Sequence, residues 1–171
     1  MVRQVFGHWA RRMSQLIFPP KGHDHADCVE DVLVRADKVC AKQNVRLTTQ
    51  RRHILEIIAA SHKAMGAYDI LEHMTVGKKR PAPVTVYRAL DFLMAQGLVH
   101  RIASDNAYIA CQRDHGDEET VFLICSACGT VGEIEAAPAN KAVAQGAAKQ
   151  GFVIDAQVHE VSGLCRNCTD E

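Results

Sequence analysis

The sequence predicts an α+β protein with an N-terminal winged helix-turn-helix domain followed by a small α/β domain. Three observations favour this fold: helical periodicity over the first half of the chain, a hairpin pattern after the last helix, and two CxxC pairs that flank the second half. We therefore divide the chain into a basic N-terminal extension (1–25), a winged-helix domain (26–111) and a second domain (112–171).

Four helices are expected in the winged-helix domain. Apolar residues recur at the helical period over four segments, which predicts helices at about 27–40, 48–58, 67–74 and 84–96. Gly97 follows the last of them, in the position where glycine usually ends a helix. Cys28 and Cys40 fall within the first helix, and we interpret both as packed helix-face residues.

A hairpin should follow, with strands at 98–103 and 107–111. Asp105 and Asn106 suit a two-residue loop because both tolerate a positive φ. This register places His100 opposite Cys111 on one face, with Cβ atoms about 4.5–5.5 Å apart, so the pair can share a metal ion. A one-residue slip would separate them, and a packed cysteine beside a half-buried histidine is the simpler alternative.

The second domain shows strand patterns at 120–125, 131–135 and 152–161 and an Ala-rich helix at 138–149. At about 60 residues it is small enough to need a covalent or metal crosslink. Two CxxC pairs separated by 36 residues flank it, which predicts a structural zinc site at Cys125, Cys128, Cys165 and Cys168. Redox-active CxxC motifs are the alternative, but neither pair heads a helix in a βαβ unit.

A second metal site is expected where the hairpin meets the second domain. Its predicted ligands are His100, Cys111, His115 and Glu133. This mixed set of sulfur, nitrogen and oxygen donors suits zinc, whereas iron or manganese would be expected with less sulfur. Asp117 or Glu118 can replace His115 as the fourth ligand.

The formal net charge of +0 conceals an uneven distribution of charge. Residues 1–25 and 26–105 each carry +3, and residues 106–171 carry −6. The basic front makes nucleic acid a candidate partner, although chance imbalance of a solvated surface gives the same numbers. No run of about 18 apolar residues predicts a membrane span. Seven cysteines, an odd number, and a poor secretory signal at the N-terminus favour a reducing, cytoplasmic location.

Several segments together are specific enough to indicate a family. They are ADKVCAKQNVRLTTQ (36–50), AYDILE (67–72), VTVYRALDFLMAQGLVH (84–100), residues 108–111 and the paired CxxC motifs. With them the sequence resembles the ferric-uptake-regulator family, most of all its zinc-uptake-regulator branch, over about residues 26–168. The resemblance implies a homodimeric, metal-activated repressor whose second domain mediates dimerisation.

The resemblance also implies roles for the metal ligands. The four CxxC cysteines would hold structural zinc, and His100, Cys111 and Glu133 would be sensor ligands, so about two zinc ions per chain are expected. Iron-sensing relatives often carry a histidine where this chain has Ala64, which favours zinc. The histidine of their last strand falls at Gln157, and whether His159 joins a third metal site stays open.

The helix at 84–96 is the candidate DNA reader. Arg88 can donate two hydrogen bonds to a guanine edge, and Tyr87 can contact thymine methyl groups. Tyr68 and Thr85 are expected to contact the DNA backbone.

We therefore expect a zinc-responsive repressor that binds palindromic double-stranded operator DNA as a homodimer and controls zinc uptake genes. The alternative is an iron-, manganese- or peroxide-sensing regulator of the same family. An enzyme is not expected, because no HxE…PCxxC arrangement or nucleophile motif is present, and no small-molecule substrate or membrane partner is predicted.

Overall fold

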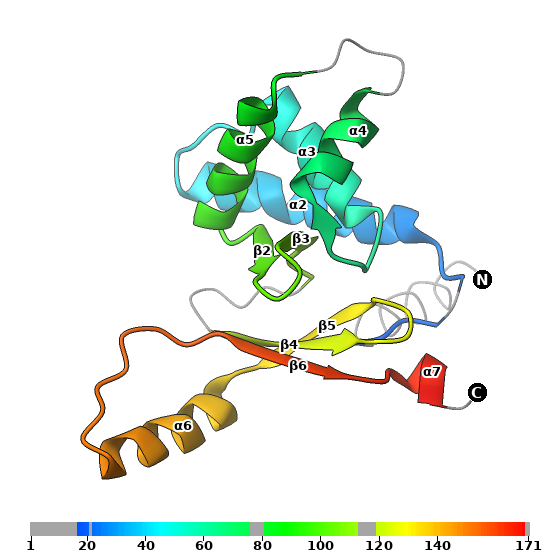
Figure 1. Ribbon diagram of the computed structural model, residues 1–171. Coiled ribbons are helices and arrows are strands. Elements are labelled where there is room, and N and C mark those ends of the chain that lie inside the picture. Colours follow the sequence, from blue (N-terminus) through cyan, green and yellow to red (C-terminus); the bar gives the residue numbers. More distant parts are fainter. Residues whose placement is uncertain (1–16, 21, 76–80, 113–118, 170–171) are drawn as a thin grey trace, which may run out of the picture.

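The computed structural model describes residues 17–20, 22–75, 81–112 and 119–169. Four helices gather at one end of the molecule, and a second sheet with its own helix lies at the other, with the hairpin β2–β3 between them (Figure 1). The helices are α2 (His25–Lys42), α3 (Thr49–Ala59), α4 (Ala67–Thr75), α5 (Pro83–Ala95), α6 (Ala137–Lys149) and α7 (Arg166–Thr169). The strands are β1 (Met65–Gly66), β2 (Val99–Ile102), β3 (Ala107–Ala110), β4 (Thr120–Cys125), β5 (Val131–Glu135) and β6 (His159–Gly163).

The four predicted helices of the first domain are confirmed, and their starts have local causes. Asp24 caps α2 by accepting a hydrogen bond from the backbone N–H of Ala26 at 2.9 Å, so the helix begins at His25. Thr48 caps α3 in the same way through the N–H of Arg51. The predicted apolar stripes face inward and form one core with the inner face of the hairpin.

Helix α5 buries one face and exposes the other. Its buried residues are Val86, Ala89, Leu90 and Leu93. Pro83 occupies the first helical position, where its missing N–H costs nothing. Gly97 has a φ of +64°, and its left-handed backbone turns the chain directly into β2.

The predicted hairpin register is wrong by two residues. His100 pairs with Ile109, not with Cys111, and Cys111 donates its N–H to Leu98 at 3.0 Å. The physical reason is the turn, which covers residues 103–106 and ends at Asn106 with a φ of +49°. Four residues rather than two therefore connect the strands, and this shifts the pairing. Side chains alternate with a period of two, so this shift keeps His100 and Cys111 on the same face.

The second sheet has the order β5-β4-β6, in which β4 pairs antiparallel with β5 and parallel with β6. The strand predicted at 152–161 is largely wrong, since β6 covers only His159–Gly163. Strand β6 pairs with β4 from His159 onward, and His159 lies beside Val121 near the start of β4. The residues before His159 lie beyond that start. Helix α6 is present as predicted but buries none of its residues within the chain.

The two domains meet through a small apolar cluster. Ile102 and Ile109 of the hairpin pack against Phe122 and Val131 of the second sheet, and all four are buried. Beside the cluster, the carboxylate of Glu160 on β6 accepts hydrogen bonds from the hairpin turn, including the N–H of Ser104 at 3.0 Å. These contacts fix how the hairpin faces the second sheet.

Within the described ranges, no helix has both the length and the apolar character needed to cross a membrane.

Candidate metal centres and nucleic-acid interface

The four CxxC cysteines lie together at one end of the second sheet. Their sulfur atoms are all within 4.8 Å of one another, and Cys128 Sγ lies 3.7 Å from Cys165 Sγ. Four sulfurs bound about 2.3 Å from one tetrahedral zinc would be about 3.8 Å apart. The turn at Gly129 (φ +73°) closes the first pair, and the start of α7 closes the second. The donor set and its spacing therefore fit zinc.

The electrostatics of these thiols also favour a cation. The backbone N–H groups of Cys165 and then Cys128 lower the pKa of Cys125 to about 6. Burial, followed by the neighbouring thiols of Cys165 and Cys128, raises the pKa of Cys168 to about 12. One thiolate thus opposes the ionisation of the next, and a divalent ion removes this conflict because it binds all four as thiolates.

A second group of donors forms at the junction of the two domains. His100 of β2, Cys111 directly after β3 and Glu133 of β5 place one ligand atom each within 4.8 Å of the others. The ring of His100 also packs against Phe122 at 5.2 Å between centroids. The group therefore combines two residues of the winged-helix domain with one residue of the second domain.

Glu133 is a buried carboxylate rather than a surface one. It is the only charged side chain in the buried class among the described residues, at 2% exposure. The N–H of Gln112 donates to its two oxygens at 3.3 and 3.4 Å, and Cys111 Sγ lies 4.0 Å from Oε2. Buried carboxylates in proteins are paired or bind metals, so the burial of Glu133 beside His100 and Cys111 fits a role as a cation ligand.

The fourth predicted ligand lies outside the described residues. His115, Asp117 and Glu118 all fall within 113–118. His159 does not join a metal-binding group among the described residues, and its Nε2 instead contacts Asn140 Oδ1 at 2.6 Å and Gln157 Oε1 at 3.2 Å.

The predicted DNA-contacting residues lie on helices α4 and α5, and their side chains are exposed or half-buried. Tyr87 and Arg88 are exposed on the side of α5 away from the core, and Thr85 is half-buried next to them. Tyr68, in the first turn of α4, is 64% exposed. Ala82, at the N-cap of α5, provides no side-chain hydrogen bond to the N–H groups of the first turn, whose positive end favours an anion.

One group of donors was not predicted. His23, His25, Cys28 and His62 also converge. Cys28 lies half-buried on a face of α2 as predicted, but its thiol lies among imidazoles rather than in the apolar core. The spacing His-x-His-x-x-Cys at 23–28 is visible in the sequence, but the fourth member comes from a distant loop that only the fold brings close.

The structure combines a winged helix, a second domain with a group of four cysteines, and a set of metal donors where the two meet. This combination is typical of a metal-dependent transcription regulator. The chain belongs to the ferric uptake regulator family, whose model matches residues 42–161. Over 142 residues it is 39% identical to the zinc uptake regulation protein of Escherichia coli (strain K12), which covers 82% of this chain and 83% of that protein. A ferric uptake regulation protein of Bordetella parapertussis is 28% identical over 125 residues, or 72% of this chain and 89% of that protein.

Solved structures agree with this assignment. A zinc uptake regulator complexed with zinc and DNA superposes with a TM-score of 0.75 at 38% identity, covering 83% of this chain and 95% of that one. Holo XcZur superposes with a TM-score of 0.73 at 36% identity, and apo XcZur superposes with a TM-score of 0.51 at 37% identity. Each comparison covers 84% of this chain and 99% of the other chain. Sequence identity to the two forms is nearly equal, so the higher TM-score shows that this structure is more similar in conformation to the holo form than to the apo form.

Proposed function

We propose that this protein is a zinc-responsive transcriptional repressor that binds palindromic operator DNA as a homodimer and controls zinc uptake genes. The observation that carries this function is the group His100, Cys111 and Glu133, in which donors from both domains face one point. A metal ion bound there joins the DNA-binding domain to the second domain. The identity to zinc uptake regulation proteins supports zinc as that metal.

The ligand assignment follows from the two predicted groups. Cys125, Cys128, Cys165 and Cys168 hold a structural zinc, and His100, Cys111 and Glu133 hold the sensor zinc, with His115, Asp117 or Glu118 as the fourth ligand. This gives about two zinc ions per chain from these sites. The division into residues 1–25, 26–111 and 112–171 belongs to the same proposal, although α2 begins at His25, one residue before the second boundary.

The positions of the three sensor residues suggest how zinc binding would select one arrangement of the two domains. His100 and Cys111 lie on the face of the hairpin that packs on the second sheet, and Glu133 lies on that sheet. All three reach one ion only when the domains are docked, so zinc binds the docked form better than the open form. A ligand shifts an equilibrium only by this difference, and a near-complete switch needs about 5.5 kcal/mol. When bound, zinc supplies that differential affinity through its thiolate, imidazole and carboxylate ligands.

The second domain carries a surface suited to dimerisation. Helix α6 buries nothing within the chain, and Phe152, Val153, Val158 and Val161 are all more than half exposed. The strand β6 is also an edge strand of its sheet. Exposed apolar side chains on and near an edge strand are typical of a surface that a partner covers. A second copy of this chain is the proposed partner.

DNA reading is assigned to α5. Each α5 of the dimer enters a major groove with its N-terminal end first, where Arg88 contacts guanine and Tyr87 contacts thymine methyl groups. Tyr68 and Thr85 contact the backbone and set the position of the helix. A DNA-binding regulator of this kind acts in the cytoplasm, which is the location we propose.

The experiment measures operator binding at controlled zinc activity. The variants are Glu133→Gln and its matched control Glu135→Gln, because both residues are on β5 but only Glu133 is buried. A labelled palindromic duplex selected by the zinc-loaded wild type is titrated with each protein in zinc-buffered solutions. We expect Glu133→Gln to need at least about tenfold more free zinc for half-maximal binding, a loss of about 1.4 kcal/mol, and Glu135→Gln to match the wild type.

Equal zinc midpoints for Glu133→Gln and the wild type would contradict the sensor assignment. Repeating the titration with ferrous and manganous ions, and with peroxide-treated protein, distinguishes the alternative function. An iron, manganese or peroxide sensor would bind or release the operator in response to those agents at activities where zinc has no effect.

A further inference from the structure

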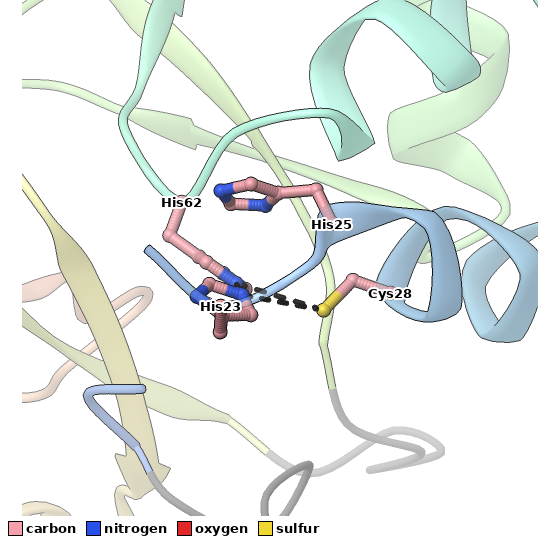
Figure 2. A group of neighbouring side chains, drawn as sticks. All are labelled: His23, His25, Cys28 and His62. Atoms are coloured by element: carbon pink, nitrogen blue, oxygen red, sulfur yellow. Dashed lines mark hydrogen bonds between the residues drawn. The ribbon is translucent and has the colours of Figure 1, made fainter. Parts of the chain in front are cut away.

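A third group of metal-binding side chains lies outside both predicted sites. His23 precedes α2, His25 is its first residue, Cys28 is in its first turn, and His62 lies in the loop between α3 and β1 (Figure 2). One ligand atom from each of the four lies within 4.8 Å of all the others. Figure 2 shows the three imidazoles and the thiol converging on one small region between α2 and the loop.

The separations are those of a tetrahedral site. Zinc binds nitrogen at about 2.0–2.1 Å and sulfur at about 2.3 Å, which puts a nitrogen and a sulfur ligand about 3.6 Å apart and two nitrogens about 3.3 Å apart. Cys28 Sγ lies 3.6 Å from His23 Nε2 and 3.7 Å from His62 Nε2. The two histidine nitrogens are 2.9 Å apart, so the rings need to separate by only about 0.4 Å to admit zinc.

Hydrogen bonding alone does not account for this arrangement. Three imidazole rings pack with centroids 4.3, 4.8 and 5.0 Å apart, and Nδ1 of His25 is buried with no hydrogen-bond partner among the described residues. A buried polar atom without a partner costs free energy, which a bound ion would recover. Burial, followed by the neighbouring His23 and His25 rings, lowers the pKa of His62 to about 4, so its imidazole is neutral at pH 7.

The surroundings of His62 resemble those of a histidine ligand. Its second ring nitrogen, Nδ1, lies 2.6 Å from the side-chain amide of Gln112. With the amide turned by 180°, the side-chain oxygen of Gln112 accepts a hydrogen bond from Nδ1–H of His62, which leaves Nε2 unprotonated to bind metal. The backbone N–H of Gln112 donates to Glu133, so one residue contacts both this group and the predicted sensor group.

The loop that carries His62 also lies against the second domain. The carbonyl of His62 accepts a hydrogen bond from Val131 at 2.8 Å, and Lys63 pairs with Thr130 across an isolated β-bridge. An ion held by His62 and the start of α2 would therefore fix the N-terminal end of that helix beside β5.

We propose that His23, His25, Cys28 and His62 bind a third zinc ion that fixes the start of α2 and the α3–β1 loop against the second domain. Three imidazoles and one thiolate in a tetrahedral arrangement favour zinc over metals that prefer oxygen ligands or octahedral geometry. Metal binding at this site does not depend on the proposed sensor.

The first test counts zinc in the full-length dimer. Wild type, Cys28→Ser, His62→Gln and the control His53→Gln are equilibrated at one buffered free-zinc activity, and zinc per chain is measured by elemental analysis. His53 is the matched control because it is a half-buried histidine on α3 that lies 3.4 Å from Glu56 and belongs to none of the three donor groups found among the described residues. We expect the Cys28 and His62 variants each to hold one zinc fewer per chain than the wild type and the control. Equal zinc contents in all four proteins would overturn the proposal.

A second test leaves His23, His25, Cys28 and His62 unchanged, so its outcome does not depend on whether variants at these positions fold. The rate at which iodoacetamide alkylates Cys28 is measured by peptide mass spectrometry with and without zinc, in the wild type and in Glu133→Gln. Zinc bound at Cys28 should slow alkylation at least tenfold in both proteins, because the sensor ligands are not involved. An unchanged rate in the wild type would refute the third site. Protection that vanishes in Glu133→Gln would also refute it, since the effect would then come from domain docking.

Discussion

Replacing Ile109 by alanine should uncouple the two domains without dismantling the helical core. Ile109 is fully buried, and it packs in the cluster with Ile102, Phe122 and Val131 rather than in the core of the helices. The substitution removes three carbon atoms, worth about 0.8 kcal/mol each, and leaves a cavity, for a total of about 2–5 kcal/mol.

Only part of that energy belongs to the contact between domains. Ile109 shares its burial between Ile102 of its own sheet and Phe122 and Val131 of the other, so about half the loss, roughly 1–2.5 kcal/mol, weakens docking. Zinc binding at the sensor group requires the docked form. The lost docking free energy therefore corresponds to about a 5- to 60-fold rise in the free zinc needed for half-maximal operator binding.

The assay is fluorescence anisotropy of the selected palindromic duplex in zinc-buffered solutions, well below the unfolding temperature of each protein. Ile58→Ala is the matched control, because Ile58 is equally buried but lies in the helical core. It should lower the unfolding temperature and leave the zinc midpoint unchanged. A wild-type midpoint for Ile109→Ala, or equal shifts for both variants, would refute the link between docking and zinc binding.

Four further predictions follow from the same structure. Arg88→Ala should weaken operator binding by about 10- to 100-fold in anisotropy titrations, and Arg88→Lys should not restore it because lysine lacks the two-pronged donor. Val161→Asp places a charge on the exposed apolar surface of β6 and should shift the dimer toward monomer in sedimentation. Cys128→Ser should remove one zinc per chain and unfold the second domain, which circular dichroism would detect. Burial raises the pKa of Glu160, but hydrogen bonds from Ser104 and Ala103 outweigh burial and lower the pKa below its usual value. The contact between Glu160 and the hairpin turn should therefore persist at pH 5 and weaken as the pH falls through the lowered pKa. Amide exchange at Ser104 measures the strength of this contact, and Glu160→Gln should abolish its pH dependence.

The sequence predicted most of the fold because local signals agree with the tertiary packing. Thr48 marks a helix start through its side-chain cap, Pro83 and Gly97 mark helix ends through their backbone conformations, and the apolar stripes match the buried faces. The hairpin register was missed because residues 103–106 form the turn, and several turn lengths suit the same polar residues. The closing strand was overpredicted because residues 152–158 have an apolar pattern but pair with no strand among the described residues.

The candidate sites divide in the same way. The cysteine group follows from spacing alone, since each CxxC pair is local. His100 and Cys111 stay on one face because the register error was an even number of residues. The group around Cys28 depends on a contact between residues 28 and 62, and no local pattern predicts which distant histidine the fold delivers.

The central claim is that zinc at His100, Cys111 and Glu133 and operator DNA at α5 favour the same docked form. Coupling of two ligands is reciprocal, so operator DNA must tighten zinc binding by the factor that zinc tightens operator binding. The most direct measurement is therefore the affinity of the dimer for sensor zinc, by chelator competition, with and without a saturating operator duplex. Zinc-linked docking predicts at least about tenfold tighter zinc binding in the presence of the duplex. Equal zinc affinities in both conditions would contradict it.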